Sequence, residues 1–420
     1  MKSTFRQRGR LAAALGKVSL VILGVGLALG IMELSLRLNP NWVPDGIRVN
    51  PPVRRVQAFQ DETYDVTLSE GDLFHWMRGS IAPLQPQEDN VVAQVHLVTD
   101  ANGFRNSSFS RTSFRIVALG DSFTFGGNAA VPWPQRLAEY SAIEVLNLGE
   151  SGSGPQQQRD ALRKYGLKAQ PQWVIMAYFE GNDMYDAAAY AQANPFLLTR
   201  VAKHLIIPGE ELSKEDESSA RGLDPGSDPA GYQYPIVVGI DNAELEMAFL
   251  SYYISWLALD RWTIESSRNY LLVMETIQEV RDMAEVAGAG FLLVYVPSKP
   301  HVYLPFITES ETLTRVFSGV PTVELDGSGY LQITTQTATP EMTFEHMGDQ
   351  VLALTDFAAE HDINLLDLTP HFAAAAATGA ELYYPFDTHW NQNGHDLATE
   401  TIARYIEAAL APKPAIGETR

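Results

Sequence analysis

Apolar runs and helical patterns alternate through most of the chain. The run FRIVAL at residues 114–119 indicates a buried strand, which ends at Gly120-Asp121-Ser122 before a helical pattern near residues 131–137. Parallel α/β sheets carry their chemistry at the carboxyl ends of their strands. Ser122 therefore stands where a nucleophile would, with its own N–H at the turn to receive an oxyanion. A serine that merely caps the next helix is the alternative interpretation.

The alternation continues beyond this strand. Further strands are expected at residues 143–148, 173–179, 290–297 and 363–368. Helices are expected at residues 156–167, 271–287, 347–360, 370–377 and 396–410. Strands and helices that repeat at this spacing predict a parallel sheet covered by helices.

Three successive strand ends bring polar groups to the same edge of this sheet. Ser122 follows the first strand, the glycine-rich loop GESGSG at residues 149–154 follows the second, and Asn182 follows the third. The loop has the spacing G-x-x-G-x-G, which differs from the dinucleotide fingerprint, and the sequence has no Gly-Lys-Ser/Thr phosphate loop. No cofactor is expected.

Two stretches, at about residues 186–263 and 306–341, interrupt the rhythm. Residues 213–229 are polar and rich in helix and strand breakers, which predicts a loop. Aromatic residues flank it: Tyr232, Tyr234, Phe249, Tyr252, Tyr253, Trp256 and Trp262. We interpret the first stretch as a cap or insertion beside the active-site edge, and its aromatic residues as packing rather than a sugar platform.

The stretch YPFDTHWNQNGH at residues 384–395 carries the remaining candidate chemistry. Asp387 stands two residues before His389, so a turn would let the carboxylate fix the imidazole tautomer and leave the other ring nitrogen for a serine. Two alternatives are loop residues with a helix cap, and a metal site that adds His395 and Asp396. The metal site is not expected, because there is no HExxH-type helix and neighbours on a helix diverge.

The N-terminus has the pattern of a targeting segment. Basic residues precede any acidic one: Lys2, Arg6, Arg8, Arg10 and Lys17. The uncharged apolar run VSLVILGVGLALGIM at residues 18–32 follows, and it reaches a membrane-spanning length of roughly 20 residues only if it continues through Leu36. The basic head predicts a cytoplasmic N-terminus, with the rest of the chain outside. An uncleaved signal anchor is favoured over a signal peptide cleaved after Ala28-Leu29-Gly30, because apolar residues continue past that point.

Composition narrows the range of partners. The chain has 420 residues and a formal net charge of −21, which argues against a surface for nucleic acid or another polyanion. It contains no cysteine, so neither disulfides nor thiolate metal sites are possible. His75 and His96 are interpreted as ordinary surface or core histidines.

Four blocks resemble those of the SGNH/GDSL hydrolases, in the same order: GDS at 120–122, NLGESG at 147–152, GND at 181–183 and DTH at 387–389. The resemblance covers about residues 111–411. It implies a flavodoxin-like α/β/α fold and ester hydrolysis or acyl transfer through an acyl-serine. It also implies residue roles: Ser122 as nucleophile, His389 as general base, Asp387 as the group that orients it, and the Ser122 N–H, Gly152 N–H and Asn182 side chain as oxyanion hole.

One departure from the family pattern concerns the last block. Many members have the aspartate three residues before the histidine, whereas here the spacing is two. The shorter spacing resembles the alginate O-acetyltransferases and related membrane-anchored members, which brings acyl transfer into consideration beside hydrolysis. A Ser–His pair oriented by a backbone carbonyl is an alternative to the aspartate.

These expectations combine into one organisation: a flavodoxin-like α/β/α sandwich with an N-terminal transmembrane helix and cap-like insertions. Its parts are a cytoplasmic tail (1–17), a signal anchor (18–38), a lead-in that packs on the catalytic domain (39–110), the catalytic domain (111–412) and a tail (413–420). The expected activity is extracytoplasmic, periplasmic-side hydrolysis of O-acetyl groups on envelope or exported glycans. An O-acetyltransferase, with a partner in an acyl-transfer complex, and a catalytically silent glycan-binding scaffold are the alternatives.

Overall fold

The computed structural model describes residues 17, 19–21, 23–36, 61–69, 90–106, 114–193, 232–240 and 243–410. The expectations for residues 1–16, His75, the polar loop 213–229 and the tail 413–420 lie outside these residues. Contacts divide the chain into two units, Met1–Pro51 with Ala191–Glu217 and Pro52–Tyr190 with Ser218–Arg420.

The first unit contains an apolar helix at Ser19–Leu36. Its 18 residues have a mean hydropathy of 2.1, and none of them is buried. Within the described residues it is the one helix that is long and apolar enough to cross a membrane, a test that signal sequences near an N-terminus also pass.

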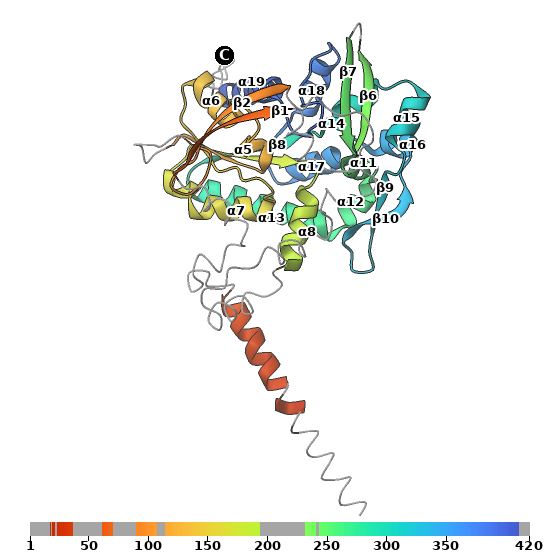
Figure 1. Cartoon of the computed structure of the whole chain (residues 1–420). Helices are drawn as coiled ribbons and strands as arrows, with labels where there is room; N and C mark the ends of the chain where they lie inside the picture. The colour runs from red at the N-terminus through yellow and green to blue at the C-terminus, as the bar shows by residue number, and fades with distance from the viewer. Residues whose placement is uncertain are drawn as a thin grey trace, which may run out of the picture. The chain divides into compact units, whose positions relative to one another are not determined.

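A five-stranded parallel sheet forms the centre of the second unit (Figure 1). The strands lie in the order β11-β8-β5-β3-β4. Their bounds are β3 (Ile116–Leu119), β4 (Val145–Asn147), β5 (Trp173–Phe179), β8 (Gly290–Val296) and β11 (Asn364–Asp367). Counted along the chain within this sheet, this is the order 2-1-3-4-5 of flavodoxin-like folds, as predicted. The chain leaves β3 for β4 on one side and returns to β5 on the other, so the sheet's switch point lies at the end of β3.

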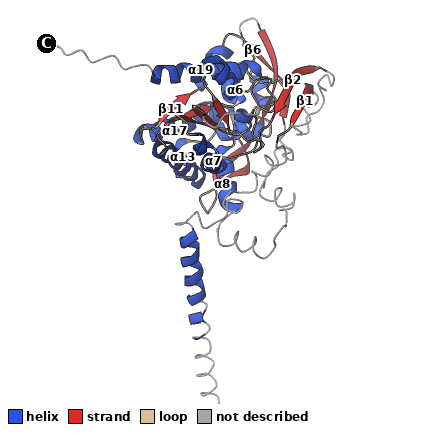
Figure 2. Ribbon diagram, turned by 90° about the vertical axis from the view of Figure 1, so that its left-hand side faces the viewer, coloured by secondary structure: helices blue, strands red, loops and turns tan. Residues whose placement is uncertain are grey.

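Helices cover both faces of the sheet (Figure 2). Alternate residues of β3 enter different cores: Val117 and Leu119 on one face, Ile116 and Ala118 on the other. Strands buried on both faces explain why the sequence shows continuous apolar runs here. The first core also takes in residues of α7 (Pro155–Lys164), α8 (Asp183–Ala193), α13 (Arg268–Val286) and α17 (Asp349–Glu360). The second takes in residues of α6 (Trp133–Ser141), α14 (Lys299–Tyr303), α18 (Thr369–Ala376) and α19 (Gln392–Leu410).

The predicted strands and long helices are confirmed to within a few residues. The one-turn helix α5 (Ser122–Phe125) and α8 were not predicted, and α8 occupies the start of the stretch interpreted as an insertion. Short 3₁₀ turns η2 (Gly166–Ala169) and η3 (Leu304–Phe306) follow α7 and α14.

Each interruption of the rhythm contains an antiparallel hairpin. The first has β6 (Tyr232–Ile240), β7 (Ala243–Leu250), α11 (Ser251–Leu257) and α12 (Arg261–Ser266). The second has α15 (Ser310–Val316), β9 (Pro321–Leu325), β10 (Leu331–Thr337) and α16 (Pro340–His346). Phe249, Tyr252 and Trp256 are buried, as expected for packing, whereas Trp262 is 70% exposed.

A smaller antiparallel sheet precedes the main one. It pairs β1 (Thr63–Ser69) with β2 (Val91–Val98). Its residues Leu68, Val95 and Leu97 share a small core with Tyr384. A turn follows β2, and Gly103 has φ 86° there, a backbone conformation that favours glycine.

Candidate active site

Ser122 lies directly beyond the carboxyl end of β3, at the first residue of α5. The cap of this helix is Asp121, whose Oδ1 accepts a hydrogen bond from the Phe123 N–H at 3.0 Å, so the interpretation of Ser122 as the cap is wrong. Only glycine fits at position 120, because an added Cβ would lie 2.8 Å from the Thr124 Cβ. The tight turn therefore puts the Ser122 side chain at the sheet edge, where His389 reaches its hydroxyl.

Ser122, His389 and Asp387 form one hydrogen-bonded line. His389 Nε2 lies 2.8 Å from Ser122 Oγ, and His389 Nδ1 lies 2.7 Å from Asp387 Oδ1. The ring thus has a carboxylate, not a backbone carbonyl, as its Nδ1 partner. A carboxylate on Nδ1 fixes that proton and leaves Nε2 to accept one from the serine.

The loop that carries Asp387 and His389 is held by hydrogen bonds from three other segments of the chain and by one hydrogen bond within the loop. Asn128 Nδ2 donates to Asp387 Oδ2 at 3.0 Å, and the Tyr384 N–H donates to the His389 carbonyl at 3.1 Å. The Ala248 N–H of β7 donates to the Pro385 carbonyl at 2.8 Å, so the first insertion contacts this loop. Lys299 Nζ donates to the Tyr384 and Pro385 carbonyls at 2.9 and 3.1 Å.

Electrostatics favours an ionised aspartate beside a basic histidine. Burial alone would raise the pKa of Asp387, but the attraction of His389 and its hydrogen bonds hold that pKa below the usual range. Burial alone would lower the pKa of His389, but the charge of Asp387 and its hydrogen bond raise it. The imidazolium that forms when His389 takes the serine proton is therefore stabilised by Asp387.

The glycine-rich loop at residues 149–154 and the strand end before it contact residues 120–125, the turn that carries Ser122, which we call the nucleophile turn. Asn147 Nδ2 donates to the Thr124 carbonyl at 2.9 Å, and the Glu150 N–H donates to the Gly120 carbonyl at 3.1 Å. Gly149 permits this approach, because a Cβ there would lie 2.6 Å from the Thr124 carbonyl carbon. Gly152 lies on an exposed turn at φ 75°, with nothing within 4 Å of its Cβ position.

The third strand, β5, pairs with β3 and brings Phe179, three residues before Asn182, onto the turn that carries Ser122. The Phe179 ring packs on Phe123 with ring centroids 4.4 Å apart. The Oδ1 atom of Asn182 is buried and has no hydrogen-bond partner among the described residues. Asp183 is buried next to it, and burial and the charge of Asp121 raise the pKa of its carboxyl. Burial likewise raises the pKa of Asp121, to about 6.

Several residues that support the site were not singled out from the sequence. Arg105 donates to the carbonyls of Gly126, Ala129 and Ala130. Asn106 exchanges hydrogen bonds of 2.9 Å with the Asn147 backbone, which fixes the second strand end. Arg105 ends the turn that follows β2, and Asn106 is the next residue. Lys299 follows the fourth predicted strand, a position that could have identified it.

Tyr253, from α11, forms a wall of the site. Its ring packs edge-on against Phe179 at 5.2 Å and lies over Gly181, whose added Cβ would be 2.9 Å from the Tyr253 ring. Burial raises the pKa of its hydroxyl, which hydrogen-bonds with Thr388 and feels the charges of Asp121 and Asp387. The first insertion thus supplies a side chain between the Asn182 loop and the His389 loop.

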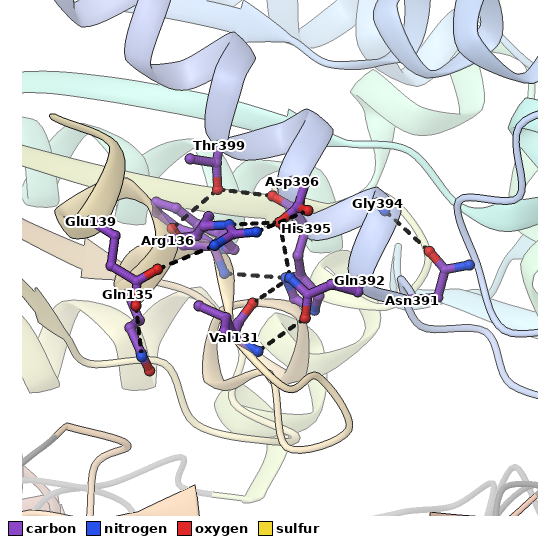
Figure 3. Close-up of polar contacts among 11 residues, drawn as sticks. Val131, Gln135, Arg136, Glu139, Asn391, Gln392, Gly394, His395, Asp396 and Thr399 are labelled. Carbon is purple, nitrogen blue, oxygen red and sulfur yellow. Dashed lines mark hydrogen bonds and ion pairs between the residues drawn. The ribbon is translucent and has the colours of Figure 1, made fainter. Parts of the chain in front are cut away.

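His395 and Asp396 serve the packing of α6 against α19 (Figure 3). His395 is buried, and its Nδ1 accepts from the Trp133 N–H at 3.3 Å, while burial lowers its pKa to about 3. Asp396 pairs with Arg136 at 3.0 Å. No group of three potential metal ligands occurs among the described residues. His96, in turn, is an exposed residue paired with Asp65.

Comparisons with known proteins find one matching family model and several similar solved structures. Residues 331–419, which include Asp387 and His389, match the family model described as "SGNH hydrolase-like domain, acetyltransferase AlgX". No curated protein sequence matches significantly. Similar solved structures include a G-D-S-L family lipolytic protein from Desulfitobacterium hafniense DCB-2, at 16% identity over 70% of this chain and 99% of that one, with a TM-score of 0.33. An extracellular lipase from Streptomyces rimosus is similar at 15% identity over 69% and 98% of the two chains, with a TM-score of 0.36.

The family match covers the last of the four sequence blocks, DTH at 387–389, and agrees with the resemblance there. Its class comprises enzymes that hydrolyse esters or transfer acyl groups. Residues 331–419 are therefore similar to the SGNH hydrolase-like domain of AlgX acetyltransferases, which supports esterase or acyltransferase activity for this chain.

Proposed function

We propose that the protein is a membrane-anchored, extracytoplasmic serine esterase that removes O-acetyl groups from envelope or exported glycans through an acyl-serine intermediate. The observation that carries this proposal is the hydrogen-bonded line from Ser122 Oγ through the His389 ring to the buried Asp387 carboxylate. A serine hydroxyl is a weak nucleophile until a base takes its proton, and this line supplies that base.

The reaction follows from these three side chains. Ser122 Oγ attacks the ester carbonyl carbon while His389 Nε2 takes the hydroxyl proton. The tetrahedral intermediate collapses as His389 returns that proton to the leaving sugar oxygen, which leaves the acyl group on Ser122. A water molecule, deprotonated by His389, then attacks the acyl-serine and releases the carboxylic acid together with Ser122.

The proposed oxyanion hole comprises the N–H groups of Ser122 and Gly152 and the side chain of Asn182. The contacts of Glu150 with Gly120, and of Phe179 with Phe123, support this assignment because they bring both neighbouring loops to the nucleophile turn. Each donor of such a site contributes roughly 3 kcal/mol to transition-state stabilisation.

The second candidate function is transfer of the acetyl group to a polysaccharide hydroxyl. The two-residue spacing of Asp387 and His389 and the match to an acetyltransferase family favour it. The chemistry differs only in the second step, in which a sugar hydroxyl replaces water. A partner that supplies the acyl donor would then form an acyl-transfer complex with this chain.

The N-terminal helix supports the proposed location. The helix at Ser19–Leu36 follows a basic head, so a cytoplasmic tail, an anchor at residues 18–38 and an exported catalytic domain at residues 111–412 form a consistent arrangement. Residues 39–110 would connect the two, and Arg105 and Asn106 at its end already contact the catalytic loops.

The test uses the full chain in detergent with acetylated and unacetylated glycans. We expect acetate release from acetylated glycans and covalent labelling of Ser122 by a fluorophosphonate, both lost in Ser122→Ala and retained in Ser266→Ala, an exposed serine of α12. Acetyl incorporation into an unacetylated glycan in place of acetate release would establish the transferase. Turnover that survives Ser122→Ala would reject both, and an unlabelled, inactive wild type would indicate the silent scaffold.

A further inference from the structure

Lys299 is a buried cation directly beneath the loop that carries Asp387 and His389. It is the first residue of α14, just beyond the carboxyl end of β8, and its side chain is fully buried. Its Nζ donates to the carbonyls of Tyr384 and Pro385, the latter two residues before Asp387 in the sequence. Both acceptors are neutral, although burying an ammonium group is costly unless a negative charge offsets the lost hydration.

The negative charge that Lys299 meets is that of Asp387. Burial lowers the pKa of Lys299 to about 7, and the attraction of Asp387 opposes that shift. The charge of Lys299 in turn contributes to the low pKa of Asp387. The charges of Asp387 and Asp121 raise the pKa of His389. Lys299 has the opposite effect on that pKa, because a nearby cation disfavours the imidazolium.

The same short segment also reaches the loop that carries Asn182. The Ser298 N–H donates to Glu180 Oε1 at 2.6 Å, and His301 Nδ1 lies 2.8 Å from Glu180 Oε2. Glu180 stands two residues before Asn182. Residues 298–301 are thereby fixed between two loops of the site, which holds the Lys299 side chain in place.

We propose that Lys299 is a positioning residue, which pins the loop of Asp387 and His389 through two carbonyls and whose buried charge limits how strongly Asp387 favours the imidazolium form of His389. This inference rests on the proposed function, since it assigns a role in the Ser122–His389 reaction. Lys299 acts through other residues and does not itself contact the reacting atoms.

The two parts of this role predict shifts of opposite sign when Lys299 is changed. In Lys299→Met the cation is lost, so the imidazolium of His389 is favoured, and the acid limb of kcat/KM against pH moves to higher pH by about 0.5 to 1 unit. If Lys299 only braces the loop, its loss loosens the contact of His389 with Asp387, and the limb moves to lower pH. A limb that stays in place or moves down overturns the electrostatic part of the proposal.

Kinetics with p-nitrophenyl acetate and NMR titration of the His389 imidazole supply two independent readouts. The titration, made in the Ser122→Ala background, needs no turnover, so it decides on Lys299 even if the proposed esterase activity is absent. We expect the His389 midpoint to rise in Lys299→Met, to stay near the wild-type value in Lys299→Arg, and to be unchanged in Lys168→Met, an exposed lysine of η2. If Lys299→Met does not fold, Lys299→Gln, which retains one donor for the carbonyls, replaces it with the same expected rise.

Discussion

His389 Nε2 lies 2.8 Å from Ser122 Oγ, although 267 residues separate the two along the chain. The contact depends on how the chain returns to the start of the domain. Helix α19 packs against α6, where the Gln392 side chain makes two 3.0 Å hydrogen bonds with the Val131 backbone and Arg136 pairs with Asp396 (Figure 3). These contacts lie just beyond the His389 loop and just beyond the Ser122 turn, so they hold both halves of the site together.

Replacing Asp387 with asparagine is expected to lower kcat by about 10³- to 10⁴-fold, with little change in KM. Asp387 accepts from His389 Nδ1 through one oxygen and from Asn128 Nδ2 through the other. An asparagine has one acceptor oxygen, so one of the two donors would face its amide group and His389 would adopt the wrong tautomer. Steady-state kinetics with p-nitrophenyl acetate measures the effect. Asp282→Asn, at an exposed carboxylate that pairs with Arg281, is the control and should retain activity within about threefold.

Replacing Asn182 with alanine tests the oxyanion hole. We expect kcat to fall by about 10²- to 10³-fold while KM changes little, because the side chain would act mainly in the transition state. Asn393→Ala, which removes an exposed amide that donates to the Glu381 carbonyl, should leave both constants unchanged. A loss in Asn182→Ala that appears only in KM would assign this side chain to substrate binding instead.

Gly149 lies in the loop after β4, and replacing it with alanine should disturb the turn that carries Ser122. The new Cβ would lie 2.6 and 2.7 Å from the Thr124 carbonyl carbon and Cβ, so the loop or the turn must move. We expect a loss of about 1–3 kcal/mol in unfolding free energy together with reduced kcat. Gly239→Ala, where nothing lies within 4 Å of the added Cβ, should change stability by less than about 0.5 kcal/mol. Denaturant unfolding of both variants makes the comparison.

The strand ends could be predicted from the sequence because burial on both faces leaves a continuous apolar run, whereas the flavodoxin-like strand order was implied only by the family resemblance. The run of β5 was predicted to the residue, and the structure places His389 Nε2 2.8 Å from Ser122 Oγ. Pairings through space were not predictable. Arg105 bonds to backbone more than 20 residues away, and Lys299 to carbonyls 85 and 86 residues away, so no spacing along the chain reports them. Helix α5 was not predicted, because its single turn carries no helical periodicity of apolar residues, so its cap, Asp121, was not identified either.

The buried pair Glu180–His301 should make stability depend on pH in a defined window. Burial alone would raise the pKa of Glu180, but attraction to His301 and hydrogen bonds from His301, Tyr295 and the Ser298 N–H lower it below 4.5. Burial alone would lower the pKa of His301, but the charge of Glu180 raises it above 6.5. A carboxyl group whose pKa is lower in the folded protein than in the unfolded chain stabilises the fold at pH values above its unfolded pKa. That stabilisation is lost as the pH falls through its folded pKa. An imidazole whose pKa is higher in the folded protein than in the unfolded chain stabilises the fold at pH values below its unfolded pKa. That stabilisation is lost as the pH rises through its folded pKa.

Both contributions are therefore complete between pH 4.5 and 6.5. We expect the difference in unfolding free energy between wild type and Glu180→Gln/His301→Gln to be largest in this window and to decline on both sides, by about 1.4 kcal/mol for each unit of pKa shift. The double variant is used because removing one partner would leave a buried, unpaired charge and mask the pH dependence. Thermal unfolding from pH 4 to 9 measures the curve. The control is the exposed pair Glu400–Arg404: for Glu400→Gln/Arg404→Gln, the difference in unfolding free energy from wild type should change little with pH. If the difference for Glu180→Gln/His301→Gln changes equally little with pH, Glu180 and His301 are not an ion pair in the folded protein.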